Sequence, residues 1–590
     1  MNEHRTLYAA MTETETNPKV LKGKTIENKK KEIGRTRITD EDGYIGTIKY
    51  VGTVASSKKN PHDIYAGIQW DDPTRGKHNG SVQHYKTKEL VHHFTCTPNT
   101  SGSFLKLHKI NYGVELNSNL IKSRYVTMND ALIAPNNVLP HYINTCKGKE
   151  KKPIEFIGEL QVRKQQQIDC INSISLRCLG ISSISKDFTD DGNPSSSLLV
   201  EQLKSMDLAG NLLYEWDEIV LMLKQFHHLE KLSLASNRLL DITFDGSAKY
   251  ENMRVLNLNS CGILSYSTIK EIDRMMPNLL ELCIACNSIG KSLELMGEST
   301  IPFYDDVKCI PSFSFSNLTL LDCSNCNITS WETQVQKCFS SFPKLSTLIL
   351  DDNSIDAINS PPSTSKDYFP SLEAMQLAGN SINSWDKIDA LNDIPNLASI
   401  RFRNNPITCS IGTGEARSII IARLPNITYV NASPVNEKER MESERRYIYS
   451  IIRDVLSRDT TDDNNNKETI IQHSLSEINK AHPRFEVLFE LHHDSMLSLL
   501  HKNKNQILCQ SGSLGSDTMN VTIKSMFPNN YTNNTLMKRL PATLSIGRLK
   551  ILCGRAFEVN VEDLLLHFKA NVRMLFILHM YFNFFSFNKG

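Results

Sequence analysis

The sequence lacks a strong bias toward charge of either sign. Its 66 Lys and Arg residues are balanced by 65 Asp and Glu residues, which gives a formal net charge of +1. Proteins that bind nucleic acid or an anionic membrane by bulk charge carry a clear positive excess. We therefore expect neither nucleic acid nor membrane as a partner.

Long apolar runs are also missing from most of the chain. No uninterrupted stretch of 18 apolar residues occurs before the C-terminal end, so no transmembrane helix is expected there. The opening residues, Met1–Arg5, contain no apolar segment of the kind that directs secretion. We therefore expect a cytoplasmic protein whose 14 cysteines are reduced thiols.

Motifs of catalysis are absent as well. The chain has neither the G-x-x-x-x-G-K-[ST] loop of nucleotide-binding proteins nor the G-x-S-x-G turn of many hydrolases. Two Cys-x-x-Cys pairs, Cys283 with Cys286 and Cys323 with Cys326, have the spacing of zinc ligands. A repeat pattern explains the same cysteines as small apolar residues, and we favour that interpretation. We expect no enzyme, no metal and no cofactor.

A leucine-rich repeat is the clearest pattern in the sequence. The template L-x-x-L-x-L-x-x-N/C-x-L occurs eight times, and a weaker copy begins at Ile171. The eight copies begin at Leu203, Leu229, Met253, Leu279, Leu318, Leu345, Leu372 and Leu397. Longer steps before Asn211 and between Asn287 and Cys326 indicate inserted loops. We predict an α/β solenoid over residues 166–450, closed by a C-terminal cap that includes Leu424–Arg445.

The repeat pattern also predicts which side chains face outward. Each repeat has one short strand whose apolar edge is buried only when the repeats stack, and the Asn or Cys side chain turns inward to satisfy backbone groups. Residues between the ladder leucines then point to a concave face, which is mostly polar or small and suits a protein interface. These residues are Asp207, Ser233, Asn257, Cys283, Asp322, Ile349, Gln376 and Arg401.

The N-terminal part reads as a small β-barrel. Glycines punctuate short β-branched and aromatic runs between residues 34 and 116, a pattern typical of short strands joined by tight turns. Residues 1–33 are expected to be a flexible arm. The segment Lys22–Arg37 holds seven Lys or Arg residues against two Glu residues. It is either a solvated arm or a site that attracts an acidic partner.

The remaining segments are less regular. Residues 117–165 are expected to connect the barrel to the repeats, and residues 451–515, with the polar run Asp459–Lys467, to form a linker region. Residues 516–590 combine a strand pattern at Met519–Lys524 with an apolar periodic stretch at Leu544–Phe557, which suggests a ubiquitin-like β-grasp. The aromatic run Met574–Phe587 does not fit that fold, so we expect the fold to be incomplete and the run to be an aggregation hazard.

A family resemblance rests on one glycine-rich segment. The segment Gly67–Ser81 resembles the CAP-Gly signature, together with Gly46–Gly52 and Gly102–Phe104. The resemblance implies an SH3-like barrel that binds the acidic, aromatic C-terminal tails of α-tubulin and end-binding proteins. The order CAP-Gly, leucine-rich repeats and ubiquitin-like end resembles the tubulin-folding cofactor E family.

This resemblance implies a function and partners. Family members bind α-tubulin and act with cofactors B, C and D in assembling or dissociating the α/β-tubulin heterodimer in the cytoplasm and at the cytoskeleton. The ubiquitin-like end implies a further contact with disassembly or proteasome machinery. The alternative, from another class, is a microtubule-associated scaffold that binds tubulin tails without folding activity.

The chemistry of a tail ending in Glu-Glu-Tyr predicts its receptor. Carboxylates and one ring need an apolar slot, a cation and backbone or amide donors, and Lys77 supplies the cation. The predicted tail-binding residues are Tyr65, Trp70, Gly76, Lys77, His78, Asn79, Gly80, Phe94 and Phe104. Trp70 and Phe104 are open to a second interpretation as core residues.

The chain departs from the CAP-Gly pattern at the predicted groove. His78-Asn79 stands where the family has Asn-Asp, and Tyr65 stands where many members have Trp. The stretch Val82–His93 is about six residues longer than the pattern.

Overall fold

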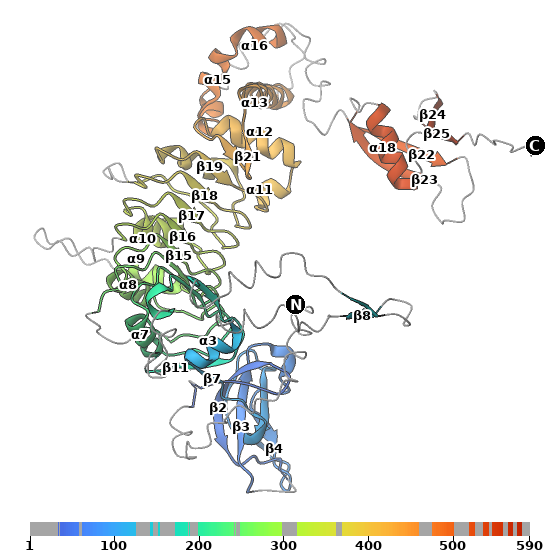
Figure 1. Ribbon diagram of the computed structural model, residues 1–590. Helices are drawn as coiled ribbons and strands as arrows, with labels where there is room; N and C mark the ends of the chain where they lie inside the picture. Colours follow the sequence, from blue (N-terminus) through green and yellow to red (C-terminus); the bar gives the residue numbers. More distant parts are fainter. Residues whose placement is uncertain are drawn as a thin grey trace, which may run out of the picture. The chain divides into compact units, whose positions relative to one another are not determined.

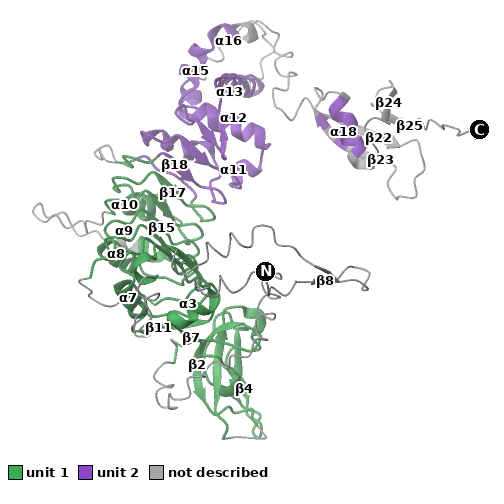
Figure 2. Cartoon of the chain, in the orientation of Figure 1, with its two compact units in different colours: residues 1–355, 361–372 green, residues 356–360, 373–590 purple. Residues whose placement is uncertain are grey.

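The computed structural model describes most of the barrel, the repeats and the cap, and parts of the C-terminal region. The described residues are 33–34, 36–57, 62–125, 142–144, 151–153, 171–186, 188, 199–240, 242, 248–297, 315–361, 368–458, 475–500, 518–525, 535–541, 546–557, 564–569 and 575–580. They form two compact units (Figure 2). The first holds residues 1–355 and 361–372, and the second holds residues 356–360 and 373–590.

The first unit begins with a four-stranded antiparallel sheet of order β1-β2-β3-β6. Its strands are β1 (Arg37–Thr39), β2 (Ile45–Gly52), β3 (Tyr65–Trp70) and β6 (Gly102–Lys106). A hairpin of β4 (Ser81–Gln83) and β5 (Leu90–His92) and the short 3₁₀ helices η1 (Pro73–Arg75) and η2 (Leu107–Lys109) complete this part. Alternate residues of β3, namely Ala66, Ile68 and Trp70, face the core with Ile38 and Ile48.

The repeats of the first unit form a parallel sheet of three-residue strands (Figure 1). These are β10 (Ser173–Ser175), β12 (Ser205–Asp207), β13 (Lys231–Ser233), β14 (Val255–Asn257), β15 (Glu281–Cys283), β16 (Leu320–Asp322) and β17 (Thr347–Ile349). Their middle residues are buried, as the leucine pattern predicts.

Helical segments follow several of these strands and bury their apolar faces in the repeat core. They are α7 (Trp216–Gln225), α8 (Tyr266–Met275), α9 (Gly290–Gly297), the π-helical η4 (Trp331–Gln336) and α10 (Lys337–Phe339). The predicted insertion between Asn287 and Cys326 begins with α9, and its residues 298–314 lie outside the described part of the chain.

An asparagine ladder closes the turns between repeats. Asn287 is buried, its Oδ1 accepts hydrogen bonds from the amides of Cys261 and Ile263, and its Nδ2 donates to the carbonyls of Leu258 and Ile284. Asn211, Asn237, Asn353 and Asn405 make equivalent contacts in their own repeats. One side chain thus pairs backbone groups that would otherwise be buried without partners.

A separate two-stranded sheet lies N-terminal to the predicted repeats. Strand β7 (Val114–Leu116) pairs in parallel with β11 (Ile181–Ile184), and helix α3 (Ser118–Arg124) follows β7. Leu116, Ile121 and Ile181 are fully buried. Residues 118–124, which the sequence assigned to a connector, therefore form ordered structure next to the first repeat. The predicted connector also contains the hairpin of β8 (Tyr142–Asn144) and β9 (Lys151–Pro153).

The second unit carries the last repeats and their cap. Strands β18 (Ala374–Gln376), β19 (Ser399–Arg401) and β20 (Tyr429–Val430) are parallel, and β21 (Ser433–Pro434) turns back antiparallel. Its helical segments are η5 (Trp385–Asp393), α11 (Pro406–Cys409), α12 (Thr413–Arg423), α13 (Glu437–Arg458), α15 (Phe485–Leu491) and α16 (His493–Leu500). All eight predicted repeats therefore contain the expected strand.

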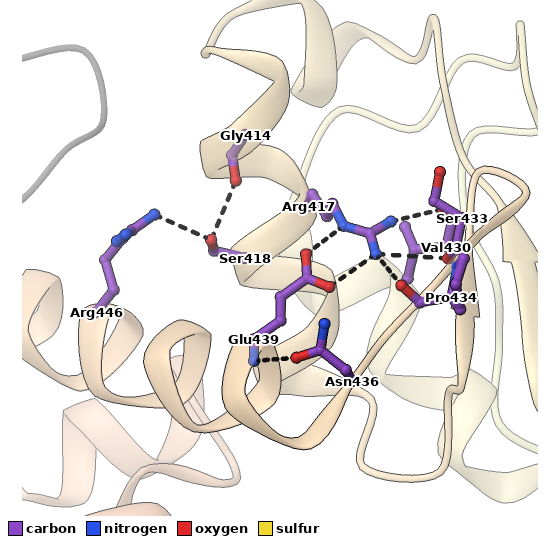
Figure 3. Close-up of polar contacts among 9 residues, drawn as sticks. All are labelled: Gly414, Arg417, Ser418, Val430, Ser433, Pro434, Asn436, Glu439 and Arg446. Carbon is purple, nitrogen blue, oxygen red and sulfur yellow. Dashed lines mark hydrogen bonds and ion pairs between the residues drawn. The ribbon is translucent and has the colours of Figure 1, made fainter. Parts of the chain in front are cut away.

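A single arginine joins the parts of the cap (Figure 3). Arg417 on α12 contacts both carboxylate oxygens of Glu439 on α13, at 2.6 and 3.0 Å. The same guanidinium donates to the carbonyl oxygens of Val430, Ser433 and Pro434. The planar fork of arginine allows one side chain to hold a helix pair and a strand turn together.

The C-terminal part of the second unit is a mixed sheet of order β23-β22-β25-β24. Its elements are β22 (Thr518–Ser525), β23 (Thr535–Pro541), α18 (Ile546–Phe557), β24 (Leu564–Lys569) and β25 (Leu575–Met580). β25 comes from the aromatic run that was expected to fall outside the fold, and it pairs in parallel with β22 and antiparallel with β24. The sequence pattern did not predict this strand, because a strand in the interior of a sheet needs no alternation of apolar and polar residues.

No helix in the described part of the chain is both long enough and apolar enough to cross a membrane.

Candidate functional site

A cluster of aromatic side chains lies on the outer face of β2, β3 and β6. Phe104 is at its centre, with ring centroids 5.4 Å from Phe94, 5.0 Å from His78, 5.3 Å from His93 and 6.2 Å from Tyr50. We call these five residues the aromatic groove. Phe94 is almost fully buried, whereas the other four are half-buried and keep ring surface open to solvent.

Glycine in β3 makes room for this cluster. Gly67 lies opposite Phe104 in the β3–β6 pairing. A Cβ added at Gly67 would lie 2.4 Å from the Phe94 ring, well inside van der Waals contact. Phe94 therefore packs directly on the β3 backbone because Gly67 has no side chain.

The loop Gly76–Gly80 is held against β6 by backbone hydrogen bonds. The amides of Lys77 and His78 donate to the Gly102 carbonyl at 2.7 and 3.1 Å, and the Gly102 amide donates back to the His78 carbonyl at 2.8 Å. Gly76 passes so close to Thr100 that an added Cβ would lie 2.0 Å from the Thr100 carbonyl oxygen. The loop thus places Lys77 and Asn79 in solvent while His78 lies on Phe104.

Both groove histidines accept a backbone hydrogen bond. The Gly80 amide donates to His78 Nδ1 at 3.0 Å, and the Ala55 amide donates to His93 Nε2 at 3.3 Å. Burial, with Lys77 and His93 nearby, lowers the pKa of His78. Burial and the neighbouring His92 lower the pKa of His93. The two imidazoles are therefore neutral at pH 7.

The predicted tail-binding residues are only partly brought together. His78, Phe94 and Phe104 are in mutual ring contact, and Lys77, Asn79, Gly76 and Gly80 form the adjoining loop. Trp70 does not line the groove, because its side chain is 2% exposed and lies in the core on the other face of β3. Arg75 covers its ring, 5.5 Å from guanidinium carbon to centroid.

Tyr65 lies at the far end of β3, where its hydroxyl is 3.5 Å from Ser57 Oγ. It shares the outer face with Gly67, two residues away. The sequence did not predict Tyr50 and His93 as groove residues, although Tyr50 lies within the segment Gly46–Gly52 and His93 directly precedes Phe94. The place of Tyr50 in the groove depends on the bulged β2–β3 pairing at Ile48/Tyr50, which periodicity alone does not reveal.

The repeat sheet offers a second surface. The predicted outward residues occupy the third position of their strands and are all partly exposed. In the second unit, Arg401 donates to Gln376 at 3.1 Å. The sequence reasoning missed a parallel row at the first strand positions, which face the same side because side chains alternate along a strand. In the first unit this row is Ser205, Lys231, Val255, Glu281, Leu320 and Thr347. We call the two rows the repeat face.

The paired cysteines do not share a face. Cys323 and Cys326 are buried, and the Cys326 thiol donates to the Ile284 carbonyl, as expected for a ladder residue. Cys283 lies on the repeat face and Cys286 is exposed. Burial raises the pKa of Cys326 to about 12, so its thiol is protonated at pH 7 and packs as a small apolar side chain.

Comparison with known proteins gives a domain match and a set of relatives that are similar along most of their length. Residues 33–110 match the family model of the CAP-Gly domain. The chain is 29% identical to tubulin-folding cofactor E of Arabidopsis thaliana, over 89% of each chain. It is 27% identical to tubulin-specific chaperone E of Homo sapiens, over 91% of this chain and 92% of that protein. With tubulin-specific chaperone E of Danio rerio it shares 26% identity, over 89% of this chain and 90% of the relative.

Proposed function

We propose that this chain is a tubulin-folding cofactor, because it is similar to the cofactor E proteins along about nine-tenths of its length. It binds α-tubulin and takes part with other cofactors in assembling and dissociating the α/β-tubulin heterodimer. The observation that carries the proposal is that one chain contains a CAP-Gly domain and leucine-rich repeats, and that a cofactor E protein is similar to it over 89% of its length. The role is that of a binding protein and not of an enzyme.

The aromatic groove supplies recognition of the tubulin tail. An α-tubulin tail ends in carboxylates beside an aromatic ring, and capture of such an end needs apolar surface, a cation and hydrogen-bond donors. Phe104 and Tyr50 offer ring surface, Lys77 is an exposed cation, and His78 and Asn79 offer polar side chains. Gly76 keeps the loop close to the backbone of Thr100 and Ser101, and Gly80 keeps it close to Phe94.

The repeat face supplies recognition of the folded tubulin body. The predicted contact residues there are Asp207, Ser233, Asn257, Cys283, Asp322 and Ile349 in the first unit and Gln376 and Arg401 in the second. Mixed polar, small and apolar side chains are typical of interfaces that bind and release.

The C-terminal sheet is a candidate for a ubiquitin-like domain. In a β-grasp the first and last strands lie side by side and parallel at the centre, and β22 and β25 have that relation. The helix α18 lies between the second and third strands in chain order, as that fold requires. The domain would connect the cofactor to the proteasome. Cofactors B, C and D are the further proposed partners, and the cytoplasm and cytoskeleton the proposed location.

The alternative is a microtubule-associated scaffold without folding activity. The observation in its favour is the CAP-Gly groove, because such a groove alone suffices to bind tails on the polymer. The two functions differ in the complex formed. A soluble complex of one chain with one α-tubulin supports the cofactor, whereas cosedimentation with microtubules and no soluble complex supports the scaffold.

A pull-down of purified α/β-tubulin by the full chain tests the proposal. It compares intact with C-terminally detyrosinated tubulin, and the wild-type chain with Lys77→Ala. Lys109→Ala is the matched control, because this lysine is also exposed in the same domain but lies on η2. We expect both removal of the tyrosine and Lys77→Ala to weaken binding, and Lys109→Ala to leave it unchanged. Absence of any tubulin binding would contradict the proposal, whereas binding that ignores both changes would assign recognition to the repeats alone.

A further inference from the structure

The barrel and the first repeat are joined by a very short piece of chain. The amide of Asn111 donates to the Thr39 carbonyl of β1, and the amide of Thr39 donates to the Asn111 carbonyl, both at 2.9 Å. Three positions further along the chain, the amide of Val114 donates to the Gly180 carbonyl of the first repeat, also at 2.9 Å. Two residues therefore separate a backbone held by the barrel from a backbone held by the repeats.

Neither of these two residues gives the chain slack. The side chain of Tyr112 packs against the barrel core. Gly113 has φ +87°, and its amide donates to Asn111 Oδ1 at 2.9 Å. A Cβ added to Gly113 would lie 2.4 Å from the Gly180 carbonyl oxygen, so glycine is needed for both the conformation and the close approach. The junction is a tight turn with contacts on both sides, and it differs from a flexible linker.

The segment that follows the junction is fixed to the repeats. Strand β7 pairs with β11, and the amide of Ser185 donates to the Leu116 carbonyl at 2.8 Å. Leu116 and, on α3, Ile121 are fully buried. The hydroxyl of Tyr125, at the end of α3, accepts a hydrogen bond from the amide of Ser175 in β10 at 2.7 Å. The barrel is thus joined directly to a segment that belongs to the packed end of the solenoid.

A second contact connects the barrel with a different repeat. Arg238 comes from the turn after β13, and its guanidinium lies 3.6 Å from the carboxylate of Asp71 in the barrel. Arg37 of β1 contacts both oxygens of the same carboxylate, which fixes Asp71 on the barrel side. The side chains of Arg238 and Asp71 are 52% and 39% exposed, so the pair contributes little stability by itself. Its effect is on orientation, because two points of attachment fix a direction that a single point leaves free.

We propose that the CAP-Gly barrel is a fixed extension of the repeat solenoid and not a tethered module, with the Asn111–Val114 junction as one attachment and the Asp71–Arg238 ion pair as the other. Domains joined in one chain are expected by default to move relative to each other. This attachment goes beyond the proposed function, because it holds whatever the chain binds. A partner that contacts both the aromatic groove and the repeat face of the first unit must then present its two contact surfaces at one spacing, as a folded protein does.

Methyl NMR relaxation of the full chain, labelled at isoleucine, tests this attachment without any ligand. Buried isoleucines in the barrel and in the repeats report how fast each part tumbles. In the wild-type chain we expect the rotational correlation times of the two sets to agree within about 20%, as in one rigid body. The barrel set is Ile38, Ile48 and Ile68, and the repeat set is Ile263, Ile269 and Ile289.

An insertion at the junction should release the barrel. Gly-Ser-Gly-Ser placed between Tyr112 and Gly113 is expected to shorten the correlation time of the barrel methyls about twofold or more, because a flexible linker lets a small domain tumble by itself. The same insertion between Lys86 and Thr87, which are exposed in the β4–β5 loop, is the matched control and should change neither set.

A charge reversal tests the second attachment. Arg238→Glu should shorten the correlation time of the barrel methyls by more than about 20%, because two like charges replace an attractive pair. Lys270→Glu is the matched control, because this lysine is exposed on α8 of the next repeat. It should leave both sets unchanged.

Each outcome bears on the attachment and not on tubulin binding. Wild-type barrel methyls that tumble at least about twofold faster than the repeat methyls would overturn the proposal, because that is the behaviour of a tethered domain. Equal correlation times in Arg238→Glu and the wild type would overturn the part assigned to Arg238. The wild-type comparison decides between a fixed and a tethered barrel even where the insertion variant does not fold.

Discussion

Gly80 passes so close to Phe94 that a Cβ added to it would lie 1.7 Å from the Phe94 carbonyl oxygen. Its φ angle is +92°, in the region that side chains rarely adopt. Two separate constraints therefore require glycine at position 80: its positive φ angle and its close contact with Phe94. The same residue donates its amide to His78, so the loop conformation and the groove depend on each other.

Gly80→Ala is expected to distort the loop and abolish binding of an acidic tail peptide. Strain at positive φ and a contact this short together cost about 2 kcal/mol or more. Gly34→Ala is the matched control, because Gly34 has φ +90° but open space around the added Cβ. Thermal unfolding and peptide titration of both variants measure the effects. If the two variants lose the same stability, the close contact with Phe94 contributes nothing beyond the strain of φ.

Asn287→Ala is expected to destabilise the repeats by about 3 kcal/mol, because it leaves the amides of Cys261 and Ile263 and the carbonyl of Leu258 buried without partners. Urea unfolding followed by circular dichroism checks this value. Asn252→Ala should change the free energy of unfolding by less than about 0.5 kcal/mol, because Asn252 is exposed and donates one hydrogen bond to His227. Equal losses in the two variants would contradict the structural role of the ladder.

Arg417→Lys is expected to loosen the cap by about 2 kcal/mol, since an ammonium cannot reproduce the fork that contacts Glu439 and three carbonyls. Hydrogen exchange of α12 and α13 would report the loss locally. Arg446→Lys serves as the comparison, because Arg446 makes one long contact, 3.5 Å, with Ser418 Oγ (Figure 3). Unchanged exchange in the Arg417 variant would show that the apolar contacts of the cap suffice.

The cysteines are expected to differ in alkylation rate. Burial, followed by Asp322 and Glu281, raises the pKa of Cys283 to about 11, so roughly 0.1% of it is thiolate at pH 8. Exposed Cys286 should react with iodoacetamide at least about tenfold faster, as mass spectrometry of labelled peptides would measure. As long as the pH is below the pKa of Cys283, its alkylation rate should increase about tenfold for each unit by which the pH is raised. Asp322→Asn should increase the alkylation rate of Cys283 at pH 8. Equal alkylation rates at Cys283 and Cys286 would contradict the raised pKa of Cys283.

Charge on the repeat face is expected to contribute to α-tubulin binding. The triple variant Asp207→Asn, Asp322→Asn, Arg401→Gln should weaken binding of intact tubulin by about tenfold, as loss of a few interface contacts does. Asparagine can still accept the local backbone hydrogen bonds that Asp207 and Asp322 make, so the fold should persist.

A second triple variant controls for net charge. It changes the formal charge by the same +1 at three exposed positions that do not belong to the strands. These changes are Asp217→Asn, Glu332→Gln and Lys224→Gln. Surface plasmon resonance with immobilised tubulin compares the two. If the first variant binds as tightly as the control, the repeat face has no part in recognition.

The amino-acid sequence by itself determined the repeat register. Leucines at fixed intervals and an Asn or Cys at the ladder position predict every strand from β12 to β19, because the burial of each strand depends on its own repeat and its neighbours. The glycine signature likewise predicts the loop beside the groove, since the positive φ of Gly80 is a property of the loop itself.

Only the tertiary structure decided which aromatic residues form the groove and where the sheets end. Trp70 belongs to the core and Tyr50 to the groove because of the β2–β3 register and its bulge, which join residues about 20 positions apart. His93 lies against Phe104 because the β4–β5 hairpin returns the chain to β6. Strands β7 and β25 pair with partners more than 50 residues away. Such pairings depend on the burial available in the folded molecule, which no local pattern records.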